Sequence, residues 1–124
     1  MKKVMFVDDS KAILYTIELA VEEMVEKGLI EASFYKNPEE AEAEINNGFV
    51  PDLIFTDINM PEMSGFEFIL KVRNKGVESP VIALTTEKTK EQKEKGKRVG
   101  MNAWLVKPFT EDKIIGMIER VFKF

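Results

Sequence analysis

The chain has 124 residues, no cysteine, no histidine and a formal net charge of −4. The missing side chains exclude disulfides, thiolate or imidazole metal sites and a histidine general base, and the acidic balance argues against nucleic-acid binding, which usually needs a basic face. The hydrophobic content of 44% suffices for one core. Because the sequence contains neither an 18-residue apolar run nor a signal peptide, we expect a single cytoplasmic domain, residues 1–124, that contacts no membrane.

Along the chain, a strand pattern alternates with a helix pattern five times. Val4–Val7 is an apolar run typical of a buried parallel strand. The helix that follows has its apolar residues at helical spacing and ends at Gly28: Ile13, Ile17, Ala20, Val21 and Met24. Ala32 and Phe34 belong to a more polar strand, which suits a sheet edge. Pro38 then opens a short helix whose apolar residues are Ala41, Ala43 and Ile45.

The second half of the chain continues the alternation. Three further apolar strands are predicted at 53–55, 81–84 and 103–106. Ser64 is placed to cap the helix after the first of these, with inward residues Phe66, Ile69 and Leu70. Residues 89–99 form a charged helix that ends at Gly100. Thr110 is predicted to cap the last helix, whose apolar side is Ile114, Ile115, Ile118, Val121 and Phe122.

This alternation predicts an α/β fold, a doubly wound five-stranded parallel sheet flanked by five helices. Right-handed crossovers restrict the possible topologies. A polar second strand at the edge favours the strand order 2-1-3-4-5, in which the first and third strands are neighbours at the topological switch point. Ligands of such sheets bind beyond the carboxyl ends of the strands at that point.

Polar side chains follow four of the predicted strands. Asp8 and Asp9 follow the first, Asp57 follows the third, Thr85 ends the fourth and Lys107 follows the fifth. We therefore expect three carboxylates, a hydroxyl and an ammonium in one crevice. Carboxylates crowded together repel one another, and a hard cation such as Mg²⁺ relieves that repulsion while keeping positions for phosphate oxygens. An aspartate can then act as a nucleophile toward phosphorus.

Each of these residues also has an ordinary structural interpretation. The adjacent acids could simply cap a helix, Asp57 could belong to a turn, and Thr85 and Lys107 could be a structural hydroxyl and a solvated lysine. All of these interpretations would have to hold at once, in places that one fold brings together. The conjunction favours a phosphoryl-accepting site.

Four segments resemble the CheY-like response-regulator receivers, and the resemblance extends over the whole chain. They are Val7–Ser10, Asp57–Gly65, Pro80–Glu87 and Val106–Phe109. The resemblance implies the flavodoxin-like fold and a phosphoacceptor at Asp57. It also implies Mg²⁺ bound directly by Asp9, by Asp57 and by the backbone carbonyl of Asn59, with Asp8 acting through water.

The same resemblance assigns roles beyond the metal site. Lys107 would pair with the phosphoryl group, Thr85 would be the switch hydroxyl and Trp104 would be the switch aromatic. The bond between Lys107 and Pro108 would be cis. Two departures from the family pattern are small: Ser64 replaces a frequent Asp as a helix cap, and the bulk of Thr86 narrows access to the acyl phosphate.

The sequence is therefore interpreted as a stand-alone response regulator of the chemotaxis type, without an output domain. We expect a phosphoacceptor that serves its own phosphorylation and dephosphorylation. It is not expected to be an enzyme that acts on a separate substrate. The resemblance implies a CheA-like sensor histidine kinase as donor, a protein target such as a flagellar motor switch component, a possible phosphatase, and a monomeric state. One alternative is a phosphorelay intermediate or phosphate sink. Another is a Mg²⁺-dependent phosphohydrolase, which the adjacent placement of Asp8 and Asp9 disfavours.

Overall fold

Five parallel strands form one sheet in the order β2-β1-β3-β4-β5, and a helix follows each strand along the chain. The computed structural model describes residues 1–124, with these elements: β1 (Lys2–Val7), α1 (Lys11–Glu26), β2 (Ile30–Tyr35), α2 (Pro38–Asn46), β3 (Leu53–Asp57), α3 (Gly65–Asn74), β4 (Val81–Thr85), α4 (Lys90–Val99), β5 (Ala103–Val106) and α5 (Glu111–Phe122). The predicted fold class and strand order are confirmed, with the polar strand β2 at one edge.

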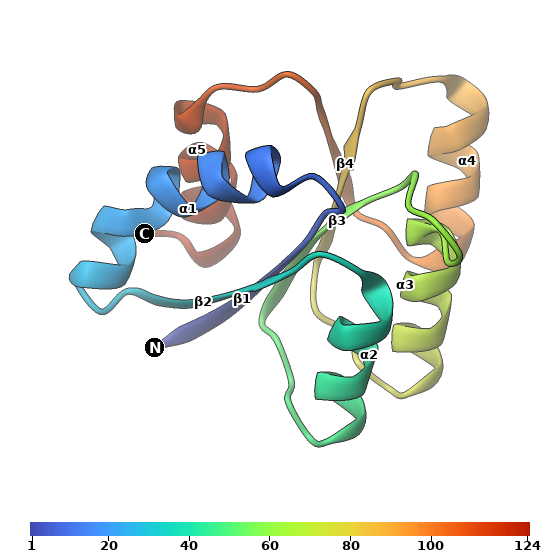
Figure 1. Cartoon of the computed structure of the whole chain (residues 1–124), viewed down its shortest axis with the longest axis horizontal. Coiled ribbons are helices and arrows are strands. Elements are labelled where there is room, and N and C mark those ends of the chain that lie inside the picture. The colour runs from blue at the N-terminus through green and yellow to red at the C-terminus, as the bar shows by residue number, and fades with distance from the viewer.

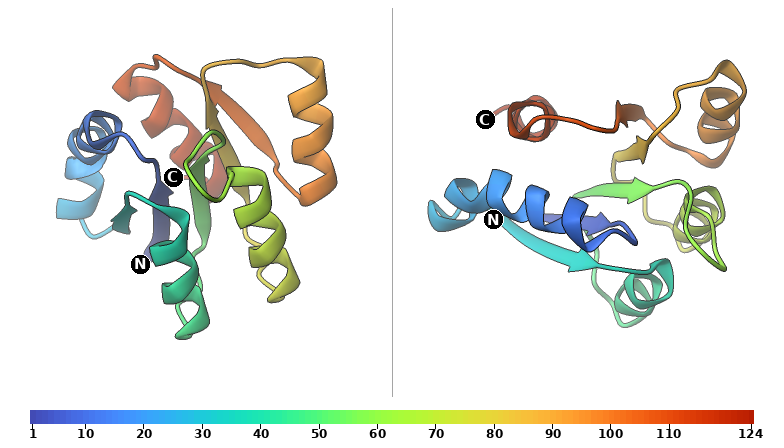
Figure 2. Two further views of the ribbon diagram at one scale, coloured as in Figure 1. Left: turned by 45° about the vertical axis from the view of Figure 1, so that its right-hand side comes forward. Right: turned by 45° about the horizontal axis from the view of Figure 1, so that its top comes forward.

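The helices form a layer on each face of the sheet. α1 packs beside α5 on one face, whereas α2, α3 and α4 cover the other (Figures 1 and 2). The core is divided in the same way: Val4 and Phe6 of β1 belong to the cluster under α1 and α5, and Met5 and Val7 belong to the cluster under the other three helices. Successive side chains of a strand point to opposite faces, which is why a strand covered on both faces is apolar throughout. None of the helices is long and apolar enough to cross a membrane.

Two local predictions are wrong. Leu70 was expected to face inward, but it is 47% exposed, and Phe68 of the same helix is fully buried instead. In α2, Ala41 and Ile45 are buried and Ala43 is exposed. In short helices the apolar spacing left two orientations open, and the contacts of α3 and α2 with the sheet and with each other decided between them. Thr110 occupies the N-cap position of α5, but its side chain makes no capping hydrogen bond.

Candidate functional site

The carboxyl ends of β1 and β3 bring three aspartates together. The two strands are neighbours in the sheet, with Val7 paired to Thr56, so Asp8 and Asp9 emerge beside Asp57. Carboxylate oxygens of the three residues all lie within 4.8 Å of one another. Asp8 and Asp57 are buried, and Asp9 is exposed at the mouth of the site. This oxygen-rich cluster fits a hard divalent cation better than any other class of ligand.

Lys107, the residue that follows β5, provides the positive charge of the site. Its Nζ lies 2.7 Å from Oδ2 of Asp8 and 3.5 Å from Oδ1 of Asp57, and the side chain is only 13% exposed. The other oxygen of Asp8 accepts a hydrogen bond from the backbone N–H of Ser10 at 2.9 Å. Asp8 is therefore held by contacts on both oxygens, whereas Asp57 has a single, longer contact with the ammonium.

Asp57 is the carboxyl group whose protonation the site changes most. Its pKa is raised from 3.8 to about 7, first by burial and then by the negative charge of Asp8. Asp9 adds to the rise through a hydrogen bond and its charge, and Lys107 opposes it. Three acids and one lysine leave an excess of negative charge in this crevice. A bound cation would remove that excess and favour the ionised, nucleophilic form of Asp57.

The loop between β3 and α3 is folded back tightly over the end of β3. The N–H of Gly65 donates to the carbonyl of Ile58 at 2.8 Å, and a Cβ at position 65 would overlap with the carbonyl oxygen of Asp57. Only glycine fits there without displacing the backbone of Asp57. The sequence analysis placed Gly65 in a motif without a role, although a glycine in a loop next to a candidate site can signal close approach of two backbone segments. Asn59 lies in this loop, two residues beyond Asp57, and its carbonyl as a metal ligand stays a prediction.

Thr85 and Trp104 lie on adjacent strands, as predicted, because Ala83 of β4 pairs with Trp104 of β5. The hydroxyl of Thr85 is fully buried. It donates to the carbonyl of Glu87 at 2.7 Å and accepts from the N–H of the same residue at 3.1 Å. In this conformation the hydroxyl therefore binds the β4–α4 loop, and the sequence could not predict this local turn.

The half-buried Trp104 packs under α4. A Cβ at Gly96 would lie 2.9 Å from Cζ2 of the indole and 3.3 Å from Sδ of Met101, and the indole Nε1 is buried without a hydrogen-bond partner. The peptide bond between Lys107 and Pro108 is cis, which confirms the expectation from the family resemblance.

The model of the response regulator receiver domain family matches residues 4–119. The chain belongs to this family. Among similar receivers, chemotaxis protein CheY1 of Helicobacter pylori strain J99 is 33% identical over 110 residues, which cover 87% of this chain and 86% of CheY1. Protein PilG of Pseudomonas aeruginosa is 32% identical over 119 residues, or 94% of this chain and 84% of PilG.

Among solved structures, the chemotaxis response regulator CheY4 of Vibrio cholerae superimposes with a TM-score of 0.84 at 36% identity and 98% coverage of both chains. Other relatives are far longer. The receiver matches 61 residues of the sensor protein EvgS of Escherichia coli, 5% of that protein, and 10% of the sensor histidine kinase CheAY of Helicobacter pylori. The similarity therefore supports signalling of the chemotaxis type. Receivers of this family generally bind Mg²⁺ at an acidic pocket and interact with histidine kinases and targets.

Proposed function

We propose that this receiver accepts a phosphoryl group on Asp57 from a phosphohistidine of a CheA-like sensor histidine kinase and then changes its affinity for a protein target. The observation that carries this proposal is the meeting of Asp57 with two further carboxylates and the ammonium of Lys107 at the switch point of the sheet. No histidine occurs in these 124 residues, so the donor histidine lies outside the receiver.

Asp8, Asp9 and Asp57, with the carbonyl of Asn59, would hold Mg²⁺. The bound ion supplies positive charge that offsets the three carboxylates and the phosphoryl oxygens. The number and kind of oxygens support this assignment, because the cluster has more negative charge than Lys107 alone balances.

In the transfer, an ionised Asp57 oxygen forms the new bond to phosphorus, and the bond from phosphorus to the donor imidazole breaks with its electron pair passing to that nitrogen. Lys107 stabilises charge on the phosphoryl oxygens, and its anchoring by Asp8 orients it toward the acceptor. The receiver contributes alignment and charge, so it is a phosphoacceptor that serves its own phosphorylation and dephosphorylation and does not turn over a separate substrate.

The signal leaves the site through Thr85. A phosphoryl group on Asp57 offers new acceptor oxygens, and turning toward them would break the contacts of the Thr85 hydroxyl with Glu87. That release would change the conformation of the β4–α4 loop and the packing of α4 against Trp104. A target that prefers the altered face shifts the equilibrium by its differential affinity. The proposed target is a flagellar motor switch component, and the presence of a chemotaxis protein among the relatives is in keeping with it.

The direct test is intact-protein mass spectrometry after incubation with acetyl phosphate and Mg²⁺. We expect one phosphoryl group on the parent, none on Asp57→Ala and little without Mg²⁺. A full-stoichiometry adduct on Asp57→Ala would contradict the proposal. Transfer of the group from the receiver to a second histidine domain, with no binding to a motor protein, would instead assign the receiver to a phosphorelay.

A further inference from the structure

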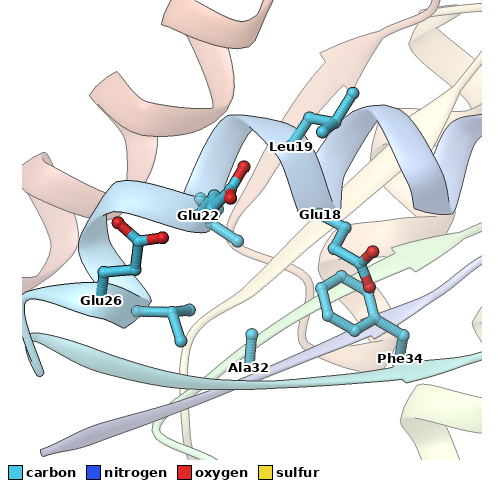
Figure 3. Close-up of a pocket in the computed structure, with 8 residues that line it drawn as sticks. Glu18, Leu19, Glu22, Glu26, Ala32 and Phe34 are labelled. Atoms are coloured by element: carbon cyan, nitrogen blue, oxygen red, sulfur yellow. The ribbon is translucent and has the colours of Figure 1, made fainter.

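The flank of α1 and the edge strand β2 enclose a groove that shares no residue with the acidic site. It has a volume of about 380 Å³ and is lined by Glu18, Leu19, Val21, Glu22, Val25, Glu26, Ala32 and Phe34. Figure 3 shows the three glutamates following one another along α1, with Ala32 and Phe34 on the neighbouring strand. The lining contains five apolar side chains and no cation. It is an apolar groove with an acidic rim.

The acids of the rim are free to bind a partner. Glu18, Glu22 and Glu26 form no ion pair, whereas Glu23, which lies outside the groove, is paired with Lys27 at 2.8 Å. The apolar wall is also accessible, because Leu19 and Val25 are 44% and 43% exposed. A partner that covers this groove must therefore bury apolar surface and offer positive charge at the same time. Lysine and arginine do both, since their aliphatic stems cover apolar surface while the charged ends reach outward.

The neighbouring strand offers backbone hydrogen-bonding groups. β2 pairs only with β1. The carbonyls of Leu29 and Tyr35 accept from the N–H groups of Lys2 in β1 and of Asp8 just after it, at 3.3 and 3.0 Å. Because the backbone groups of successive residues point to opposite sides of a strand, the odd-numbered residues of β2 face β1 and the N–H and C=O groups of Ala32 and Phe34 point to the open edge. An extended segment can pair with such an edge, and a helix cannot.

The spacing of the acids matches an extended partner. Glu18, Glu22 and Glu26 are four residues apart, which places them about 6 Å apart along the helix axis. Alternate side chains of a strand, which share one face, are about 6.7 Å apart. Basic residues at every second position of an added strand would each meet one glutamate.

We propose that the groove between α1 and β2 docks an extended cationic segment of a partner protein, with lysine or arginine at alternate positions, which adds a strand to the edge of β2. Pairing of two copies through this same face would oppose acid to acid, and an anionic membrane surface would be repelled, so the charge selects a basic polypeptide. The docked segment leaves the acidic site and α4 uncovered.

The probe is a peptide of alternating Lys and Val that begins and ends with Lys, and its control is a peptide of the same composition with the lysines in one block. Titration of the ¹⁵N-labelled full chain by NMR should shift the amides of Ala32 and Phe34 with the alternating peptide, and the block peptide should bind at least about fivefold more weakly. Equal affinity of the two peptides, or shifts confined to other surfaces, would overturn the proposal.

The triple variant Glu18→Gln, Glu22→Gln, Glu26→Gln should weaken binding of the alternating peptide roughly tenfold, because three ion pairs are lost. The matched control is Glu44→Gln, Glu67→Gln, Glu94→Gln, which makes the same change in net charge at exposed positions outside the groove. It should change the affinity less than about threefold. Similar losses in both triple variants would show binding to net charge alone and would overturn the proposal.

The strand pairing has its own test. Ala32→Pro removes an outward N–H at an edge, where proline is tolerated, and should abolish binding while circular dichroism shows a folded chain. Two probes N-methylated on all lysines or on all valines test the same pairing with the protein unchanged, and one of them should lose binding while the other keeps it. Retained binding of both methylated probes would overturn strand addition. Self-association of the chain is the last outcome to test. If the chain associates with itself at high concentration and the Glu18, Glu22, Glu26 triple variant does not, the groove binds the cationic α4 of a second copy. That result would overturn the proposal.

Discussion

α1 and α4 both begin at the acidic edge of the sheet, but they are attached to the molecule very differently. α1 starts two residues after Asp9 and buries five side chains, among them Leu14 and Ile17. α4 follows the loop that binds the Thr85 hydroxyl, and its only buried residue is Gly96. Its other contacts include the half-buried Val99, which packs against the core, and the ammonium of Lys95 at 4.8 Å from the ring centroid of Phe66.

The difference teaches where a local chemical change can produce movement. An element that buries many apolar side chains moves only at a cost of several kcal/mol, whereas one that rests on a glycine and an indole has little to lose. The receiver therefore combines a firmly packed helix beside its aspartate cluster with a lightly held helix beside the Thr85 hydroxyl. Four predictions test this contrast, in order of decreasing effect.

The largest effect is expected in α1. Ile17→Ala should lower the free energy of unfolding by roughly 2–5 kcal/mol, because Ile17 is fully buried and its loss leaves a cavity. Val99→Ala in α4 removes a half-buried side chain and should cost less than about 1 kcal/mol. Urea denaturation measures both. Equal losses would show that α4 is as firmly attached as α1.

The second-largest effect on stability is expected from Asp57 in the acidic site. The pKa of Asp57 is raised from 3.8 to about 7 on folding, so the folded protein holds this proton more firmly than the unfolded chain. Without metal, stability should fall as the pH rises from about 4 through about 7, and Asp57→Asn should remove that loss. The gain from Asp57→Asn should approach an upper limit of about 4 kcal/mol above pH 7 and vanish near pH 4.

Thermal unfolding in EDTA across this pH range measures the gain, and Mg²⁺ should reduce it by neutralising the acids. The matched control is Asp52→Asn, an acid outside the site, which should show no comparable pH dependence. A pH-independent gain from Asp57→Asn would mean that repulsion among the carboxylates is not its source.

A smaller effect on stability is expected where Gly96 of α4 lies against Trp104. Gly96→Ala adds a Cβ that meets the indole of Trp104 at 2.9 Å, while the helix gains about 1 kcal/mol from alanine propensity. These terms oppose each other, so the net stability should change by less than about 1 kcal/mol while the indole is displaced. A red shift of Trp104 fluorescence at nearly unchanged stability is the expected result. Gly116→Ala in α5, where a Cβ meets nothing within 4 Å, is the control and should leave the spectrum unchanged.

The smallest energetic effect accompanies activation itself. Beryllofluoride with Mg²⁺, as a phosphoryl mimic on Asp57, should change the fluorescence of Trp104, the only tryptophan of the chain. Thr85→Ala should shrink the change, because it removes the buried hydroxyl that binds the β4–α4 loop. An unchanged spectrum with confirmed beryllofluoride binding would mean that the signal leaves by another route.

The sequence by itself determined the sheet and the composition of the site. Apolar runs and turn residues predicted five strands, and the polar character of β2 placed it at an edge. The carboxyl ends of parallel strands share one side of the sheet, so residues far apart in sequence, such as Asp8, Asp57 and Lys107, could be assigned to one crevice without coordinates.

Only the tertiary structure decided which face of each short helix packs against the sheet and which contacts the residues around the site make. Leu70 and Phe68 are equally apolar, and only packing against the sheet chose Phe68 for the core. The bond of Thr85 to the Glu87 backbone, the contact of Gly96 with Trp104 and the groove between α1 and β2 all depend on distances between elements. Periodicity fixes the faces of one element, whereas the position of that element against its neighbours follows from the packing of the whole domain.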